Sequence, residues 1–171
     1  MSRATPSRES AELVVVGIMD EYDAFIDILD TVLKTTLTGV RGGRALETEV
    51  KKLKEDRLGS ARAVVRQEVA NTVRQRSAVS KDPNDWREYG EEAMVKAVED
   101  DLVAIAESIY EGLLRLKVDP DYFIGRLQRF RNPLVTAFLG AWQQAASAHK
   151  VAEEVKAAVK PAAPKAPARG R

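Results

Sequence analysis

The chain has 171 residues, including 27 basic residues, 26 acidic residues and one histidine, and it contains no cysteine. This length suits one domain, and the lack of cysteine excludes a disulfide framework, a thiolate zinc site and a cysteine nucleophile. No apolar run approaches the roughly 18 residues that a membrane span requires, and the apolar stretch 13–19 is too short for a secretory signal. We therefore expect an intracellular protein that needs no metal or cofactor and is not an enzyme.

The net charge of the chain is only +1, but the charged residues are strongly segregated along the sequence. Residues 1–40 carry a net charge of −4, residues 41–81 one of +6, residues 82–125 one of −8 and residues 126–171 one of +7. Blocks of alternating sign suit helices that pair with one another or with copies of themselves, and the basic blocks suit a polyanion. The alternative is that the blocks neutralise each other within one bundle.

An amphipathic helix is predicted after a polar arm at residues 1–8. Apolar side chains recur at helical spacing from Glu9 to about Thr38, and acidic side chains populate the other faces. One face carries Tyr22, Ile26, Leu29 and Leu33. We expect the helix to end at the glycine-rich segment 38–43, because glycine frays a helix and readily adopts positive φ. The arm has no apolar stripe and is predicted to be flexible.

A second helical stretch is predicted from about Arg44 to Val79. Gly59 is a candidate interruption, so the sequence leaves open whether this stretch is one helix or two. Its second half carries an apolar stripe of Val65, Val69 and Val73. Beside that stripe, Arg62, Arg66 and Arg74 fall on an arc of about 120° at 100° per residue.

Three later helices share one start signal, an Asp or Asn directly before a proline. The signal occurs at Asp82-Pro83, Asp119-Pro120 and Asn132-Pro133. Asp or Asn at the N-cap accepts a hydrogen bond from a free backbone N–H, and proline at the next position has no N–H to satisfy. The predicted helices run from Pro83 to about Lys117, from Pro120 to about Phe130 and from Pro133 to about Val159.

The fold class predicted by these patterns is all-α, a bundle of four to five helices in a single domain over residues 9–159. No segment favours a strand with comparable strength. Residues 160–171 are rich in proline, alanine and basic side chains. That composition cannot form a core and is typical of an extended, disordered end. The domain is thus expected to lie between a flexible arm and a disordered basic tail.

Polar side chains that would serve catalysis do not converge in the sequence. The single histidine, His149, lies among alanines on a predicted helix surface, where a solvated residue is more typical than a general base. The Glu-x-x-His spacing of a di-iron bundle is absent, and segment 39–43 lacks the lysine and hydroxyl of a phosphate-binding loop. We predict no catalytic, cofactor-binding or metal-binding residue.

Two clusters of arginine are the candidate functional residues. Guanidinium groups bind phosphate bidentately, and such contacts hold a nucleic-acid backbone without reading its sequence. Nearby aromatic residues at helix starts more typically anchor a core than stack on bases. The predicted phosphate contacts are Arg62, Arg66, Arg74, Arg76, Arg126, Arg129 and Arg131. The neighbouring aromatic residues are Trp86, Tyr89, Tyr122, Phe123 and Phe130.

Residues 132–142, Asn-Pro-Leu-Val-Thr-Ala-Phe-Leu-Gly-Ala-Trp, resemble a helix-initiating segment in the coat proteins of rod-shaped tobamoviruses. Most of these positions agree, including the proline, the Leu-Val-Thr-Ala run and the Leu-Gly-Ala before an aromatic residue. Residues 61–66, Ala-Arg-Ala-Val-Val-Arg, are faintly similar to an earlier helix of the same proteins. The resemblance implies a subunit of a helical rod built around nucleic acid.

The architecture also resembles the major coat proteins of filamentous archaeal viruses. The shared features are a short N-terminal arm, proline-started helices, scattered arginines and no cysteine. In those families, the resemblance implies, paired helical coat subunits wrap double-stranded DNA in a helical sheath. Both resemblances thus indicate the same role.

The sequence therefore predicts a structural major coat protein that polymerises into a helical virion, made in the host cytoplasm, and binds genomic nucleic acid without sequence specificity. Double-stranded DNA is favoured over RNA. The other expected partner is a further copy of the chain or a paralogous coat subunit, with no small-molecule substrate. The alternative is a cytoplasmic helical interaction or adaptor protein, phasin-like or nucleoid-associated, with a basic tail.

Overall fold

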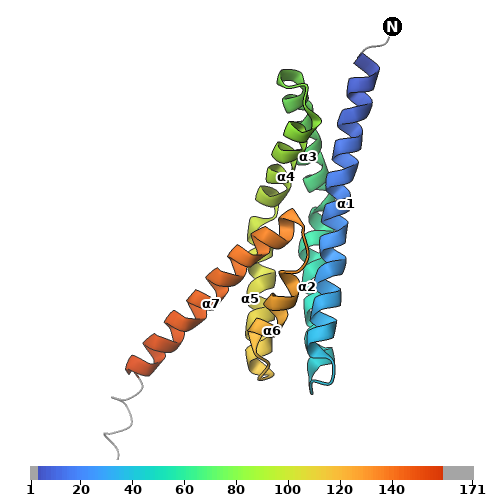
Figure 1. The fold of residues 1–171 in the computed structure, drawn as a ribbon. Helices are drawn as coiled ribbons and strands as arrows, with labels where there is room; N and C mark the ends of the chain where they lie inside the picture. Colours follow the sequence, from blue (N-terminus) through green and yellow to red (C-terminus); the bar gives the residue numbers. More distant parts are fainter. Residues whose placement is uncertain (1–3, 160–171) are drawn as a thin grey trace, which may run out of the picture.

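The structure, a computed structural model, describes residues 4–159, and that part of the chain contains helices and loops but no strand (Figure 1). The all-α prediction is confirmed. In chain order the elements are α1 (Ala4–Leu37), α2 (Gly43–Lys54), the π turn η1 (Glu55–Gly59), α3 (Ser60–Val79), α4 (Pro83–Ala97), α5 (Glu99–Arg115), α6 (Pro120–Leu127) and α7 (Pro133–Val159). The predicted basic tail, residues 160–171, lies outside the described residues.

Helix α1 is the longest element and runs along one side of the molecule (Figure 1). The rod formed by α2, η1 and α3 returns beside it in the opposite direction, and α3 and α4 form an antiparallel hairpin at one end. Helix α5 continues from α4 towards the other end, α6 turns back, and α7 leaves the bundle obliquely. Because α1 contacts α2, α3, α4, α6 and α7, it is the column on which the bundle is built.

The ends of α1 differ in how well the sequence predicted them. The helix begins at Ala4, so most of the predicted arm at residues 1–8 belongs to α1, and only residues 1–3 lie outside the described part of the chain. The glycine-rich stop is confirmed. The helix ends at Leu37, and Gly39 and Gly42 take φ values of +76° and +82°, a region that residues with a Cβ rarely adopt.

All three predicted start signals are confirmed, and each acts as an N-cap. The side-chain oxygens of Asp82, Asp119 and Asn132 accept hydrogen bonds from the backbone N–H two residues later, at 3.0, 2.9 and 2.8 Å. Proline is the first residue of α4, α6 and α7, where its missing N–H removes no helical bond.

The stretch from Gly43 to Val79 forms one helical rod with a π turn at the predicted interruption. The backbone stays in the right-handed helical region at Gly59 and Ser60. Within the turn, the carbonyl oxygen of Leu58 accepts a hydrogen bond of 2.5 Å from the Tyr22 hydroxyl of α1. Tyr22 is fully buried, and burial raises the pKa of its phenol above the ordinary value. A π turn alters the regular hydrogen-bond ladder, and here it supplies the acceptor that a buried phenol needs.

The prediction of one helix from Pro83 to Lys117 is wrong, because the backbone breaks at Val98. This residue has φ −121° and ψ 13° and separates α4 from α5. It is fully buried, so core packing holds the break in place. The three acidic residues that follow, at positions 99–101, form the first turn of α5, where negative charge complements the helix dipole. The predicted end of α6 at Phe130 is also too late, since α6 ends at Leu127.

The core follows the predicted apolar stripes and is joined across helices by aromatic rings. Val65, Val69 and Val73 of α3 are fully buried. Phe25 of α1 lies 6.0 Å from Phe138 of α7, and Phe123 of α6 stacks on Trp142 of α7 at 5.1 Å, measured between ring centroids. Each such pair contributes about 0.5–1.5 kcal/mol beyond the burial of its area. These rings attach the first half of α7 to α1 and α6.

Two helical glycines provide a matched test of this packing. A Cβ added to Gly90 of α4 would lie 2.6 Å from Ile18 Cδ1 and 2.9 Å from Val73 Cγ2, whereas one added to Gly140 of α7 meets nothing within 4 Å. Alanine gains about 0.5–1 kcal/mol of helix propensity at either position, but overpacking costs about 1–3 kcal/mol. We expect Gly140→Ala to raise the free energy of unfolding in urea by about 0.5–1 kcal/mol and Gly90→Ala to lower it by about 1 kcal/mol. Equal stabilisation by both would contradict the close α1–α3–α4 packing.

Candidate nucleic-acid interface

Arg62 and Arg76, two of the predicted phosphate contacts, are engaged in ion pairs between helices. The Arg62 guanidinium of α3 donates two hydrogen bonds of 2.8 Å to Asp23 of α1. Hydrogen bonding to this carboxylate raises the pKa of Arg62. This bidentate pair joins α3 to α1, so the charge of Arg62 is balanced before any ligand approaches.

Arg76 makes a similar connection between α3 and α4. Its guanidinium pairs with Asp85 and lies 4.2 Å from the ring centroid of Tyr89. The hydrogen bond from Arg76 lowers the pKa of the Asp85 carboxyl. With an ion-pair partner and an aromatic ring on α4, Arg76 joins the two helices of the α3–α4 hairpin. We therefore do not include Arg62 or Arg76 in the candidate interface.

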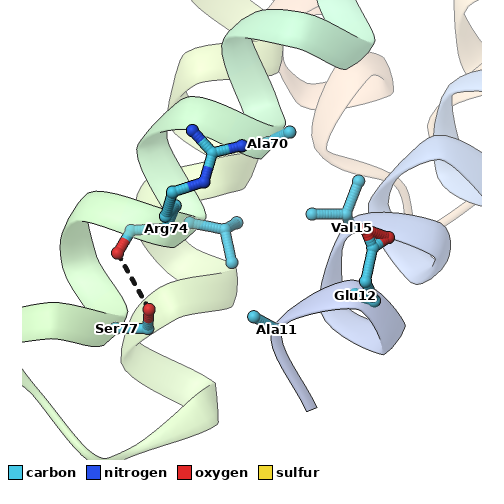
Figure 2. A pocket seen from close by; sticks show the side chains of 7 residues that line it. Ala11, Glu12, Val15, Ala70, Arg74 and Ser77 are labelled. Carbon is cyan, nitrogen blue, oxygen red and sulfur yellow. Dashed lines mark hydrogen bonds between the residues drawn. The ribbon is translucent and has the colours of Figure 1, made fainter. Parts of the chain in front are cut away.

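Arg66 and Arg74 are exposed on α3. Arg66 has no hydrogen bond or ion pair with any described residue, and Arg74 donates to the Asn71 side chain at 3.2 Å. Figure 2 shows Arg74 on the α3 wall of a pocket whose other wall, on α1, carries Glu12. A phosphate bound within this pocket would face the carboxylate as well as the guanidinium, which makes the pocket a less favourable phosphate site than the exposure of Arg74 alone indicates.

The second arginine cluster lies where α6 passes into α7. Arg126 is half-buried and donates to the Tyr122 carbonyl at 3.2 Å and to the Thr36 hydroxyl at 3.5 Å. Arg129 and Arg131 are exposed, and neither has an ion pair or side-chain hydrogen bond with any residue from 4 to 159. We call this surface the α6–α7 corner, and it consists of Tyr122, Arg126, Arg129, Phe130 and Arg131.

Exposed aromatic side chains accompany these arginines, contrary to the expectation that they would anchor the core. Tyr122 is 63% exposed and Phe130 is 39% exposed, and on α4 Tyr89 is also exposed. The expectation is confirmed only for Trp86 and Phe123, which are buried. Helical spacing explains why Phe123 is buried and Tyr122 is exposed. Phe123 and Leu127 share the buried face of α6, and Tyr122 is rotated about 100° away from Phe123. The segment 122–131 carries three arginines and no acidic residue.

The structure does not bring the two arginine clusters together. Arg74 lines the same pocket as Glu12 of α1, Arg62 contacts Asp23, and Arg126 contacts Thr36. At 1.5 Å per residue these positions spread over roughly 36 Å of α1, and Asp23 and Thr36 are about 140° apart around its axis. The α3 arginines and the α6–α7 corner are therefore separate surfaces.

Hydrogen bonds from α4 and from the start of α7 meet at Glu21 of α1. The Asn132 side chain, which caps α7, also donates to the Glu21 carbonyl of α1 at 2.9 Å. The Glu21 carboxylate accepts from Arg87 of α4 at 3.1 Å, and Arg87 also donates to Glu91 at 3.1 Å. Burial and the adjacent Glu91 raise the pKa of Glu21 to about 7. Two carboxyl groups thus share one guanidinium, and one Glu21 oxygen has no hydrogen-bond partner in the described structure.

The described residues bear on two other kinds of site, a metal centre and a membrane span. Within residues 4–159, no three side chains of His, Asp or Glu are grouped so as to hold a metal ion. His149 lies beside Tyr110, with ring centroids 5.7 Å apart, and its Nε2 is 3.9 Å from a Glu153 carboxylate oxygen. In the described part of the chain, no helix combines the length and the apolar character needed to cross a membrane.

Comparisons with protein-family models, with curated proteins and with solved structures found no match to this chain.

The raised pKa of Glu21 predicts a specific dependence of stability on pH. Because Glu21 holds its proton to about pH 7 in the folded state but only to about pH 4.5 when unfolded, folding binds a proton between these values. The free energy of unfolding should therefore fall by about 1–3 kcal/mol as the pH rises from 4.5 to 7.5. Glu21→Gln keeps the acceptor for Arg87 and cannot titrate, so urea unfolding of this variant should lose that part of the slope.

Glu68→Gln is the control, because Glu68 is an exposed residue of α3. It should reproduce the pH profile of the unsubstituted chain. Identical pH profiles for Glu21→Gln and the unsubstituted chain would contradict the assignment to Glu21.

Proposed function

We propose that this protein is a structural coat subunit that polymerises into a helical assembly, such as a virion, and binds double-stranded DNA through phosphate contacts without sequence specificity. The α6–α7 corner is the proposed contact surface. This proposal retains the predicted contacts Arg126, Arg129 and Arg131 and assigns structural roles to Arg62 and Arg76.

The observation that carries the proposal is the exposure of Arg129 and Arg131 without any partner among the described residues. An arginine already in an ion pair must lose that pair to bind phosphate, whereas these two must lose only water. Arg126 lies one helical turn from Tyr122 and donates to its carbonyl, so the base of the surface is fixed. The neighbouring aromatic residues add faces that suit contact with sugars or bases.

Helical polymers need contacts between unlike surfaces of neighbouring subunits, because contacts of this kind need not close into a ring. The described bundle offers surfaces of opposite charge. The corner is basic, and the exposed sides of α4 and α5 are acidic. The resemblance of residues 132–142 to a coat-protein helix is a second, independent support, and its first two residues form the start of α7.

Electron microscopy tests the role directly. The purified full chain, mixed with long linear double-stranded DNA at low salt, should give filaments of constant diameter that protect the DNA from nuclease. Long single-stranded RNA in a parallel sample is expected to give less protection. Dispersed particles, or binding without regular filaments, would contradict the coat role and favour the alternative of a helical adaptor protein.

Two double variants with the same change of charge test which surface binds. We expect Arg129→Gln/Arg131→Gln to weaken DNA binding and to reduce the slope of log K against log salt by about 2, since each lost phosphate contact removes about 0.9. Arg66→Gln/Arg74→Gln, on exposed positions of α3, should change both quantities much less. Fluorescence anisotropy with labelled DNA at several salt concentrations measures them.

The two variants also separate the competing assignments. Loss of binding only in the α3 variant would move the interface to α3 and contradict the corner. Unchanged binding in both variants would contradict phosphate binding by either cluster. Because all four residues are exposed, each variant should unfold within about 0.5 kcal/mol of the unsubstituted chain.

A further inference from the structure

An acidic groove runs between α4, α5 and the first half of α7. Two adjoining depressions share Val95, Glu99 and Ala137 and so form one continuous surface. Its apolar part is built from small side chains, chiefly Val95, Val103, Ala137 and Ala141, and includes no aromatic residue. Such a surface suits small aliphatic groups rather than a flat ring.

The rim of this groove carries carboxylates that form no ion pair with any described residue. Glu88, Glu92, Glu99 and Asp100 are exposed, and none of them has an ion pair with any residue in the described part of the chain. Lys96 is the one basic residue on the rim, and Glu91 is paired with Arg87. An occupant of the groove should therefore combine positive charge with small apolar side chains.

The tail at residues 160–171 has that chemistry. It contains Lys160, Lys165, Arg169 and Arg171, and its remaining residues are alanine, proline and one glycine. Proline lacks an N–H, so burying it leaves no unsatisfied donor, and its restricted φ reduces the entropy lost on binding. In polyproline II conformation, Lys165 and Arg169 would be about 12 Å apart. Glu92 of α4 and Glu99 of α5 lie on the groove on either side of the break at Val98.

The direction of α7 indicates whether the tail that binds the groove belongs to the same subunit or to a neighbouring one. The groove contacts α7 between Pro133 and Gln144. The helix then continues away from α4 and α5 to Val159 (Figure 1), a further distance of about 22 Å. A tail that bound its own groove would have to reverse direction directly after the helix and run back along it. A neighbouring subunit meets no such constraint.

We infer that the tail, residues 160–171, of one subunit binds in the acidic groove of the next subunit. Lysine and arginine side chains pair with the rim carboxylates, and the proline and alanine side chains pack on the small apolar residues of the groove. The tail and the groove are different surfaces of the chain, so the contact is head-to-tail and extends into an open polymer. The inference rests on the proposed function in one respect, since it supplies the subunit contact that a helical coat requires. The contact itself needs no nucleic acid.

Sedimentation velocity of the full chain without nucleic acid tests this contact. At low salt, the average mass should rise with protein concentration. Deletion of residues 160–171 should leave the chain monomeric, and so should the groove variant Glu88→Gln/Glu92→Gln/Glu99→Gln. The control Glu68→Gln/Glu107→Gln/Glu111→Gln changes the net charge equally at exposed positions outside the groove, and it should associate like the unsubstituted chain.

Mixing the two deficient chains identifies the donor and the acceptor. The groove variant still has a tail and the deleted chain still has a groove. The mixture should therefore form dimers of one copy of each that grow no further, although neither chain associates alone. A labelled peptide of residues 160–171 should bind the deleted chain, and the groove variant of that chain should bind it about tenfold more weakly, with a strong dependence on salt.

Three outcomes would overturn the inference: a monomeric unsubstituted chain at all concentrations, undiminished association after deletion of the tail, or equal loss in the groove variant and the control. Failure of this contact is distinguishable from failure of the proposed function. If the deleted chain associates like the full chain without nucleic acid and still forms regular filaments on DNA, the inference fails and the coat role stands. If the chain polymerises through its tail but does not bind DNA, the coat role fails and the contact stands.

Discussion

The buried face of α1 is the constraint on which the rest of the bundle depends. Five helices pack on this one column, and its largest buried side chains, among them Tyr22, Phe25 and Leu29, meet different neighbours along its length. The Tyr22 hydroxyl reaches the π turn, and Phe25 reaches α7. Because interiors are close-packed and transmit strain, a change in the rotation of α1 would disturb the hairpin, the rod and the α6–α7 corner together.

The polar contacts of α1 determine which charged residues remain available. Asp23 pairs with Arg62, Glu21 with Arg87, and Asp30 with Lys54, whose side chain is buried beside the π turn. These pairs balance part of the alternating charge within the bundle, as the simpler interpretation of the charge blocks expected. The balance is incomplete. The corner keeps exposed arginines, and the rim of the α4–α5–α7 groove keeps exposed carboxylates.

Helix α7 has two halves with different environments. Its first half is fixed by the Asn132 cap and by ring contacts of Phe138 and Trp142, whereas residues 150–158 are exposed. The exposed second half of α7 therefore lies between the groove and Val159, where the described part of the chain ends. Alanine, which is frequent in this second half, favours a helix that receives little help from packing.

The sequence by itself determined the all-α class, the three capped starts and the glycine stop, because caps, proline and glycine act through the local backbone. The buried stripe of α3 followed in the same way from helical periodicity.

The break at Val98 was decided by core packing, which no local residue signals. Tertiary structure also decided which arginines remain accessible. Arg62 and Arg66 lie one turn apart on the same helix, yet only Arg62 comes within reach of Asp23. An ion pair between residues 39 positions apart depends on how two helices pack, and the spacing of residues along one helix does not contain that information.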